Sequence, residues 1–155
     1  MANKPILYML IGIPASGKST WIKNHKHDAV IIDTDSYLDD VAYKAGLTYS
    51  NVFAAHSKAA EKAMYTKLAQ AVKDRKDILW DQTNLTIKSR MKKLAMIPDD
   101  YDKIAVIFKN PDHDELRRRL DSRPGKDIPM PIIRNMINSY QPPHDSEGFD
   151  KVINV

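Results

Sequence analysis

The sequence contains no cysteine and no long hydrophobic run. Without cysteine the chain has no disulfide framework, no Cys-ligated zinc or iron–sulfur centre and no thiol nucleophile. No apolar stretch approaches the ~20 residues that a helix needs to cross a bilayer. The apolar N-terminal segment PILYMLIGIP lacks the charged lead-in and the small-residue cleavage site of a signal peptide. We therefore expect a soluble, cytoplasmic protein without a membrane partner.

The 155 residues show no repeat, no low-complexity tract and no linker-like shift in composition. This length suits one compact domain, and we expect a single domain over residues 1–155. The chain has 24 basic and 20 acidic side chains, a formal net charge of +4. A basic balance is compatible with an anionic partner but does not distinguish a nucleotide from a nucleic acid. Composition gives no indication of oligomeric state.

Short apolar runs alternate with longer segments of helical periodicity along the chain. The runs expected to be strands are Ile6–Ile11, Ala29–Ile32, Ile78–Trp80, Ile104–Phe108 and Val152–Val155. The segments expected to be helices are Lys18–Lys26, Ser36–Lys44, Asn51–Lys76, Ile87–Met96, Asp112–Ser122 and Met130–Tyr140. The strand runs are apolar on both faces, as in a sheet that helices cover on both sides. This alternation predicts an α/β fold with a parallel sheet and right-handed crossovers.

The most specific motif lies between the first strand and the first helix. Its sequence, Gly-Ile-Pro-Ala-Ser-Gly-Lys-Ser at residues 12–19, matches the phosphate-binding pattern G-x-x-x-x-G-K-[ST] in the required strand–helix context. The glycines let the backbone wrap a phosphate, and the N–H groups point inward beside the helix N-terminus. Lys18 would hold the β and γ phosphates of ATP, and the Ser19 hydroxyl would bind Mg²⁺. The expected nucleotide-binding residues are Gly12, Pro14, Ala15, Ser16, Gly17, Lys18, Ser19 and Thr20.

A phosphate-binding loop leaves kinase, GTPase, motor and DNA-packaging ATPase open, so the end of the second strand carries more information. It continues into Asp33-Thr-Asp35-Ser-Tyr, at the edge of the sheet where ligands bind in such folds. A carboxylate there can accept the proton of a substrate hydroxyl while a γ-phosphoryl group is held in line. Asp35 is therefore the candidate general base and substrate-binding residue. The alternative is that Asp33 or Asp35 only caps the following helix.

The third strand ends in Asp81-Gln-Thr83-Asn84, on the same side of the sheet. Asp81 is a candidate magnesium ligand, acting through water, or a hydrogen-bond partner of the phosphate loop. Asn84 is a candidate for orienting a substrate phosphate or the loop that bears Asp35. The alternative is simple turn chemistry, which favours Asp, Thr and Asn whatever the function. The basic residues of the next helix are expected to be solvated: Lys88, Arg90, Lys92 and Lys93.

The fourth strand leads to a basic segment, residues 116–126, that has five basic side chains and one acidic one. Arg119 and Arg123 are four residues apart and share a face if the helix reaches that far. Pro124-Gly125 would end the helix and form a hinge. The segment therefore predicts an arginine lid over the triphosphate, with Arg123 preferred to Arg119 because it lies beside the hinge. A basic helix C-terminus that complements the helix dipole is the alternative.

Taken together, these motifs resemble the kinase domain of the bacteriophage polynucleotide 5′-kinase/3′-phosphatase family. The resemblance rests on GIPASGKSTW, DTDSY, the Asp-x-Thr-Asn of residues 81–84, the Arg-x-x-x-Arg of residues 119–123 and IPMPIIRNMINSY, in the same order over nearly the whole chain. It implies a three-layer α/β/α P-loop fold of the adenylate-kinase-like type, with five parallel strands in the order 2-3-1-4-5. It also implies an ATP- and Mg²⁺-dependent kinase of nucleic-acid 5′ ends with a role in nucleic-acid repair. Asp35 would activate the 5′-hydroxyl, and the lid arginine would contact the phosphates. If encoded by a phage, such a protein would act in the host cytoplasm.

Two departures from that family bear on the acceptor. The family has an arginine that grips a substrate phosphate three residues after the catalytic Asp, and this sequence has Leu38 there. The sequence also has no second, carboxylate-rich domain before Val155, so we expect no 3′-phosphatase activity. Similar small P-loop kinases act on nucleosides, nucleotides, modified bases in DNA or, in the zeta toxins, sugar nucleotides. These acceptors remain alternatives, as does a nucleotide-dependent switch or ATPase without an acceptor.

Overall fold

The computed structural model describes residues 3–25 and 28–155 of the chain. Within them, the strands are Ile6–Ile11 (β1), Val30–Ile32 (β2), Ile78–Trp80 (β3), Asp102–Ile107 (β4) and Lys151–Asn154 (β5). The α-helices are Lys18–His25 (α1), Asp35–Ala45 (α2), Tyr49–Lys73 (α3), Ile87–Leu94 (α4), His113–Asp121 (α5) and Met130–Ser139 (α6). A 3₁₀ turn, η1, covers Asp145–Glu147. The part of the first predicted helix at Lys26 lies outside the described residues.

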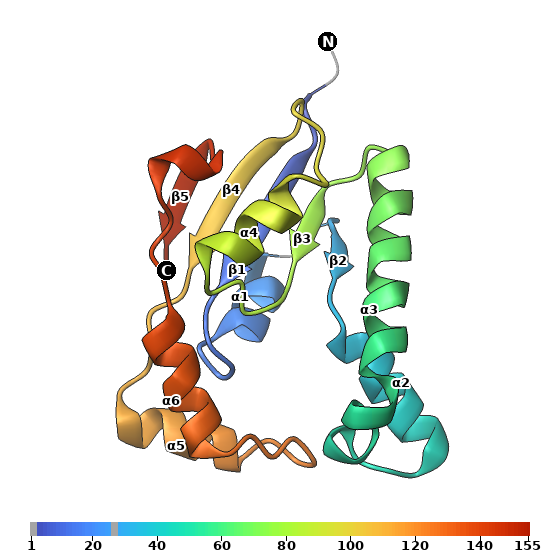
Figure 1. Ribbon diagram of the computed structural model, residues 1–155, viewed down its shortest axis with the longest axis vertical. Helices are drawn as coiled ribbons and strands as arrows, with labels where there is room; N and C mark the ends of the chain where they lie inside the picture. The colour runs from blue at the N-terminus through green and yellow to red at the C-terminus, as the bar shows by residue number, and fades with distance from the viewer. Residues whose placement is uncertain (1–2, 26–27) are drawn as a thin grey trace.

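The strands form one parallel sheet in the order β2-β3-β1-β4-β5 (Figure 1). This is the strand order that the resemblance implied, so the predicted fold class is confirmed. The central strand β1 pairs with β3 and β4, and it ends at the phosphate loop. Because all strands run the same way, the segments that follow β1, β2 and β3 leave the sheet at one edge.

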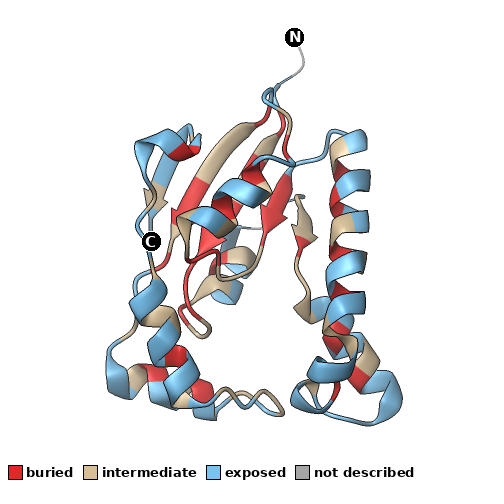
Figure 2. Cartoon of the chain, viewed as in Figure 1, coloured by how far each residue is buried: buried red, intermediate tan, exposed pale blue. Residues whose placement is uncertain are grey.

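The two faces of the sheet pack against different helices. Leu7, Met9 and Ile11 of β1 belong to a core cluster with Met64 and Leu68 of α3. Leu10 faces the opposite side, where it belongs to a cluster with Trp21 of α1. Figure 2 shows buried positions along the central strands and along one side of α3. The sheet is therefore covered on both faces, which explains why the strand sequences are apolar without alternation.

Several element boundaries differ from the sequence prediction for identifiable reasons. The strand β4 begins at Asp102 because it continues to pair with β1, where Asp102 lies opposite Ile6. The helix α3 ends at Lys73, and Arg75 after it has the left-handed φ of 52°. The helix α5 ends at Asp121 and is capped by Ser122. The prediction ended this helix one residue later, at Ser122, and the stop before Arg123 and Pro124 agrees with it, because a residue before proline avoids the helical conformation.

Candidate active site

The phosphate loop joins β1 to α1 and depends on glycine at two positions. A Cβ atom on Gly12 would lie 2.6 Å from Ser16 Oγ and 2.9 Å from Phe108 Cβ, so a larger residue does not fit there. Gly17 has a φ of 106°, which side chains other than hydrogen rarely allow. The loop turns back on itself, and Lys18 Nζ donates a hydrogen bond of 2.6 Å to the carbonyl oxygen of Gly12. The loop backbone and the lysine amine are thus held together by the loop's own contacts.

Lys18 lies among negative charges at the edge of the sheet. Its burial lowers the pKa of the amine to about 8, and the nearby carboxylates of Asp81 and Asp35 oppose that shift. Burial raises the pKa of Asp81 to about 6, and the positive charge of Lys18 opposes this change. The two groups therefore stabilise each other's charged form, although each is largely removed from water. Both are ionised between about pH 6 and about pH 8.

Asp35 is the first residue of α2, and its carboxylate faces the same region. Tyr49 Oη donates a hydrogen bond of 2.8 Å to Asp35 Oδ1. The helix cap is Thr34, which makes no side-chain capping bond, while Asp33 Oδ2 accepts a bond of 2.9 Å from Ser36 Oγ. In the described part of the chain the Asp35 carboxylate accepts no hydrogen bond from the main chain. Of the two aspartates that the sequence left as possible helix caps, Asp33 contacts a residue of the first turn of α2, Ser36, and Asp35 does not act as a cap.

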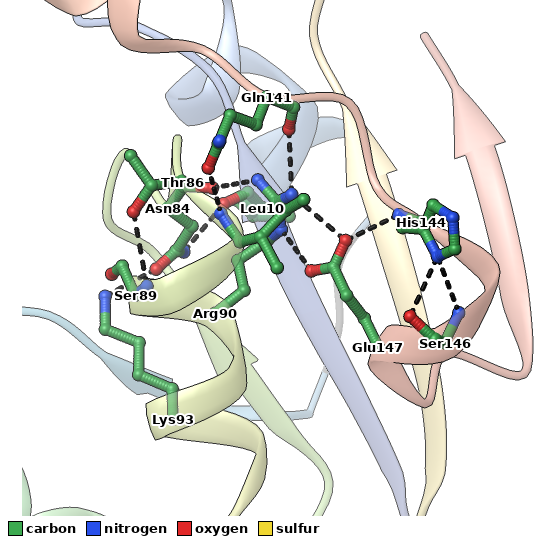
Figure 3. Close-up of polar contacts among 11 residues, drawn as sticks. Leu10, Asn84, Thr86, Ser89, Arg90, Lys93, Gln141, His144, Ser146 and Glu147 are labelled. Atoms are coloured by element: carbon green, nitrogen blue, oxygen red, sulfur yellow. Dashed lines mark hydrogen bonds and ion pairs between the residues drawn. The ribbon is translucent and has the colours of Figure 1, made fainter.

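The three residues after β3 that were predicted to bind substrate do not all lie on the cavity. Asp81 and Thr83 face the cavity, but Asn84 is buried behind it. Asn84 adopts a φ of 49°, donates to the carbonyl oxygen of Leu10 at 2.8 Å and accepts from Lys93 Nζ at 2.5 Å (Figure 3). Because its amide is fully engaged, Asn84 braces the loop after β3 and does not face the cavity where a substrate phosphate would bind.

The expectation of a solvated basic face on α4 was wrong for two residues. Arg90 is fully buried and forms an ion pair with the equally buried Glu147, with Nε 2.7 Å from Oε1 (Figure 3). It also donates to the carbonyl oxygens of Asn84 at 3.0 Å and Gln141 at 2.8 Å. Through these bonds Arg90 ties the loop after β3 to the chain after α6. Lys93 is the second residue, and burial lowers the pKa of its amine to about 8.

The two arginines that the sequence predicted for a lid lie in different elements. Arg119 lies on α5, where Nε donates to Glu115 Oε1 at 2.7 Å and Nη1 donates to the carbonyl oxygen of Ala15 at 3.0 Å. Arg123 lies beyond the end of α5, so the two side chains do not share a helical face. Both line the cavity, and Arg119 already contacts the phosphate loop. The helix α5 thus anchors one arginine, and the turn after it presents the other.

These elements surround a cavity of about 1200 Å³. Single-ligand pockets occupy roughly 300–1,000 Å³, so the cavity has room for a nucleotide and part of a second molecule. The predicted residues that line it are Pro14, Ala15, Ser16, Gly17, Lys18, Ser19, Thr20, Asp35, Asp81, Thr83, Arg119 and Arg123. Of the predicted set, Gly12 and Asn84 do not line it; Gly12 instead supplies the carbonyl oxygen that Lys18 contacts.

Several residues around this cavity were not among the predicted site residues, and three of them bear on the chemistry. Tyr49 and Phe53 line it from the first turns of α3, and Lys126 lines it from the turn after α5. The position of Tyr49 follows from the α2–α3 hairpin, which brings a residue 14 positions away onto Asp35. No local motif marks such a contact. Lys126 lies in the basic segment that was predicted to form the lid, and that segment is the sequence feature that could have indicated its position on the cavity.

The fold and the phosphate loop at the end of β1 define a P-loop protein of the kinase-like type. Residues 7–143 match the family model AAA_33, described as an AAA domain. The chain therefore belongs to the AAA_33 family.

Solved structures share this fold at low sequence identity. A chain in the structure of the Pnkp1/Rnl/Hen1 RNA repair complex is 22% identical, with a TM-score of 0.69 over 90% of this chain. This chain spans only 45% of that one. A gluconokinase from Sinorhizobium meliloti is 15% identical, with a TM-score of 0.55 over 99% of this chain and 83% of its own. Shikimate kinase from Bacteroides thetaiotaomicron is 16% identical, with a TM-score of 0.54 over 96% and 86%.

Within residues 3–25 and 28–155, no helix combines the length and apolarity that crossing a membrane requires.

Proposed function

We propose that the chain, as a single domain, is an ATP-dependent kinase that transfers the γ-phosphoryl group to an alcohol, and that this alcohol is the 5′-hydroxyl of a nucleic acid. The observation that carries the proposal is that Asp35 and the Lys18-bearing phosphate loop line one cavity. Asp35 would accept the hydroxyl proton as the new O–P bond forms. The bond between the γ-phosphorus and the β,γ-bridging oxygen then breaks, and ADP leaves.

The cavity has donors suited to a triphosphate. Among the described residues, the buried side-chain atoms without a hydrogen-bond partner are Ser16 Oγ and Arg123 Nη1. Both belong to residues that line the cavity. A buried charged donor without an acceptor is costly, and phosphate oxygens would satisfy it. Lys18, Arg119 and Arg123 would hold the phosphates, and Arg123 would stabilise the charge that develops during transfer.

The residues also fit a magnesium ion. Mg²⁺ in such sites is held by one or two protein oxygens, substrate phosphates and waters, so a dedicated cluster is not needed. Asp81 lines the cavity and, within the described chain, makes no side-chain hydrogen bond. Burial raises the pKa of Asp81 and the charge of Lys18 only partly opposes this, so a bound cation would stabilise the ionised carboxylate. Ser19 and Asp81 would hold the ion, which when bound neutralises charge on the phosphates.

A half-exposed aromatic ring supports a base-bearing acceptor. Phe53 is 49% exposed and lines the cavity, with its ring centroid 5.9 Å from that of Tyr49, the partner of Asp35. Nucleobases stack on such rings without regard to sequence. A nucleic-acid acceptor is also compatible with the similar fold of a chain in an RNA repair complex.

A smaller acceptor, such as a nucleoside, a nucleotide or a modified base, is the second candidate. The observation in its favour is Leu38, which is fully buried in the contact between α2 and α3. That position therefore offers no cation to a substrate phosphate, and a longer nucleic acid has one fewer anchor.

Labelled ATP with a panel of acceptors tests the proposal. We expect label on DNA or RNA oligonucleotides that carry a 5′-hydroxyl and none on the same oligonucleotides already phosphorylated at that end. Transfer to free nucleosides or nucleotides alone would replace the first acceptor by the second. ATP hydrolysis without any transfer would identify a switch or an ATPase.

Replacing Phe53 with Leu is expected to raise KM for the oligonucleotide. Loss of one base–aromatic stack costs about 1–3 kcal/mol, which corresponds to roughly 5- to 150-fold in affinity. KM for ATP should not change, because Phe53 lies beside Tyr49 on α3 and belongs neither to the phosphate loop nor to the basic segment at residues 116–126. Steady-state kinetics with each substrate varied in turn measures both constants. An unchanged KM for the oligonucleotide contradicts the stacking role.

The charges of Lys18 and Asp81 predict that kcat/KM for ATP depends on pH along a bell-shaped curve. The Asp81 carboxyl, with a pKa of about 6, must lose its proton to hold Mg²⁺, so kcat/KM for ATP should rise as the pH increases through 6. The Lys18 amine, with a pKa of about 8, must keep its proton to hold phosphate, so kcat/KM should fall above pH 8. Because kcat/KM reports the free enzyme, these are the relevant values.

The variant Lys18→Arg is the control for the alkaline limb, since a guanidinium stays charged over the whole range. Its remaining activity should not fall near pH 8. If the limb persists in this variant, Lys18 is not its origin.

A further inference from the structure

The turn after α5 is docked onto the start of α3. We call residues 123–127 the lid turn. Ser50 N donates to the carbonyl oxygen of Gly125 at 3.1 Å, and the amide of Asp127 donates to Ser50 Oγ at 3.1 Å. A Cβ atom on Gly125 would lie 2.9 Å from Thr48 Cβ, so the two segments are in close contact. The part of the protein that presents Arg123 therefore touches the first turn of the helix that carries Tyr49.

Tyr49 is held between the lid turn and the candidate base. Lys126 Nζ lies 4.8 Å from the centre of the Tyr49 ring, a cation–π contact, and 3.2 Å from Asp39 Oδ2 of α2. On its other side the Tyr49 hydroxyl donates to Asp35 Oδ1 at 2.8 Å. Burial and the hydrogen bond to Asp35 raise the pKa of Tyr49 above its ordinary value. The hydroxyl therefore keeps its proton and remains a donor at every pH at which an enzyme of this class operates.

The hydrogen bond from Tyr49 involves only one of the two carboxylate oxygens of Asp35. In the described part of the chain Oδ1 of Asp35 accepts from Tyr49, and Oδ2 has no hydrogen-bond partner. One fixed oxygen restricts rotation of the side chain, and the other stays available to a substrate hydroxyl. The position of a general base controls its efficiency, since a displacement of about 1 Å can cost roughly 100-fold in rate.

We propose that Tyr49 is a positioning residue for Asp35: it fixes one carboxylate oxygen, and the lid turn, through Lys126, clamps the tyrosine in place. The inference rests on the proposed function, because it requires Asp35 to be the base. The same five-residue turn carries both Arg123 and Lys126, so the segment that would contact the phosphates also holds the tyrosine that fixes the base.

Replacing Tyr49 with Phe tests the inference, because Phe keeps the ring that Lys126 contacts and removes only the hydroxyl. We expect kcat for transfer to fall about 10- to 100-fold with no change in KM for ATP. Slow hydrolysis of ATP without acceptor should also be unchanged. A purely structural role would lower transfer and hydrolysis together. The matched control is Tyr43→Phe on α2, where the side chain is 86% exposed, and its kcat should equal that of the wild type.

The double variant of Asp35→Asn and Tyr49→Phe distinguishes the positioning role of Tyr49 from the role of Asp35 as general base. If Tyr49 acts only through Asp35, the double variant should transfer at the same residual rate as Asp35→Asn alone. A further loss, or a wild-type kcat in Tyr49→Phe, overturns the positioning role while leaving the kinase proposal intact. If Asp35→Asn itself transfers at the wild-type rate, the proposed function fails first.

Discussion

Replacing Asp35 with Asn is expected to lower phosphoryl transfer by about 100- to 10,000-fold, the usual contribution of a general base. The amide has nearly the shape of the carboxylate and can still accept the hydrogen bond from Tyr49. It cannot take a proton from an alcohol. Binding of ATP should be preserved, because the phosphate loop and the lid arginines are unchanged. Transfer to an accepted alcohol and nucleotide affinity by calorimetry measure the two effects separately.

Asp33→Asn is the matched control, because this carboxylate lies two residues away and also follows β2. Its partner is Ser36, at 2.9 Å, and the Asn side chain retains an oxygen for that bond. Asp33 does not line the cavity, so transfer should stay within about twofold of the wild type. Equal losses in the two variants would show that charge near β2 matters and that no particular carboxylate acts as the base. Undiminished transfer in Asp35→Asn would remove Asp35 from the chemistry.

The sheet could be predicted from the sequence because each strand is short, apolar on both faces and followed by a turn signal. β1 and β3 begin and end at the residues that the apolar runs indicate. The strand order came from the family resemblance, since periodicity does not reveal which strands are neighbours. Boundaries failed where pairing or capping decided them: β4 extends to Asp102 because it pairs with β1, and α5 ends one residue early because Ser122 caps it.

The site was predictable where chemistry is local in sequence and not where it depends on tertiary contacts. The phosphate loop is one continuous segment, Asp81 directly follows β3, and Asp35 comes shortly after the end of β2 in the same sheet. Asn84 and Arg90 have ordinary polar sequences around them, and only the structure shows that both are buried. Tyr49 reaches Asp35 through a helical hairpin, and the cation near its ring comes from residue 126. Such contacts leave no spacing pattern to recognise.

The buried pair of Arg90 and Glu147 predicts the largest effect on stability. Replacing Arg90 with Met should lower the free energy of unfolding by about 3–5 kcal/mol, because it leaves the Glu147 carboxylate buried without its partner. The carbonyl oxygens of Asn84 and Gln141 also lose their donors. Urea unfolding followed by circular dichroism measures the change. The control is Lys44→Met, whose ion pair with Asp40 is mostly exposed, and it should cost at most about 1 kcal/mol.

The pH dependence of the same variant distinguishes a lone buried charge from lost packing. Burial opposes ionisation of Glu147 in the wild type, but hydrogen bonds from Arg90 and from His144 N outweigh it, and the net pKa lies below the ordinary 4.5. The pair therefore contributes fully above about pH 4.5, and its contribution is lost as the pH falls through the lower folded value. Without Arg90, burial acts with less opposition and favours the protonated carboxyl. Relative to the wild type, Arg90→Met should then recover stability as the pH is lowered toward 5. A deficit that stays constant with pH would mean that the lost packing of the arginine side chain, and not an unpaired carboxylate, causes the destabilisation.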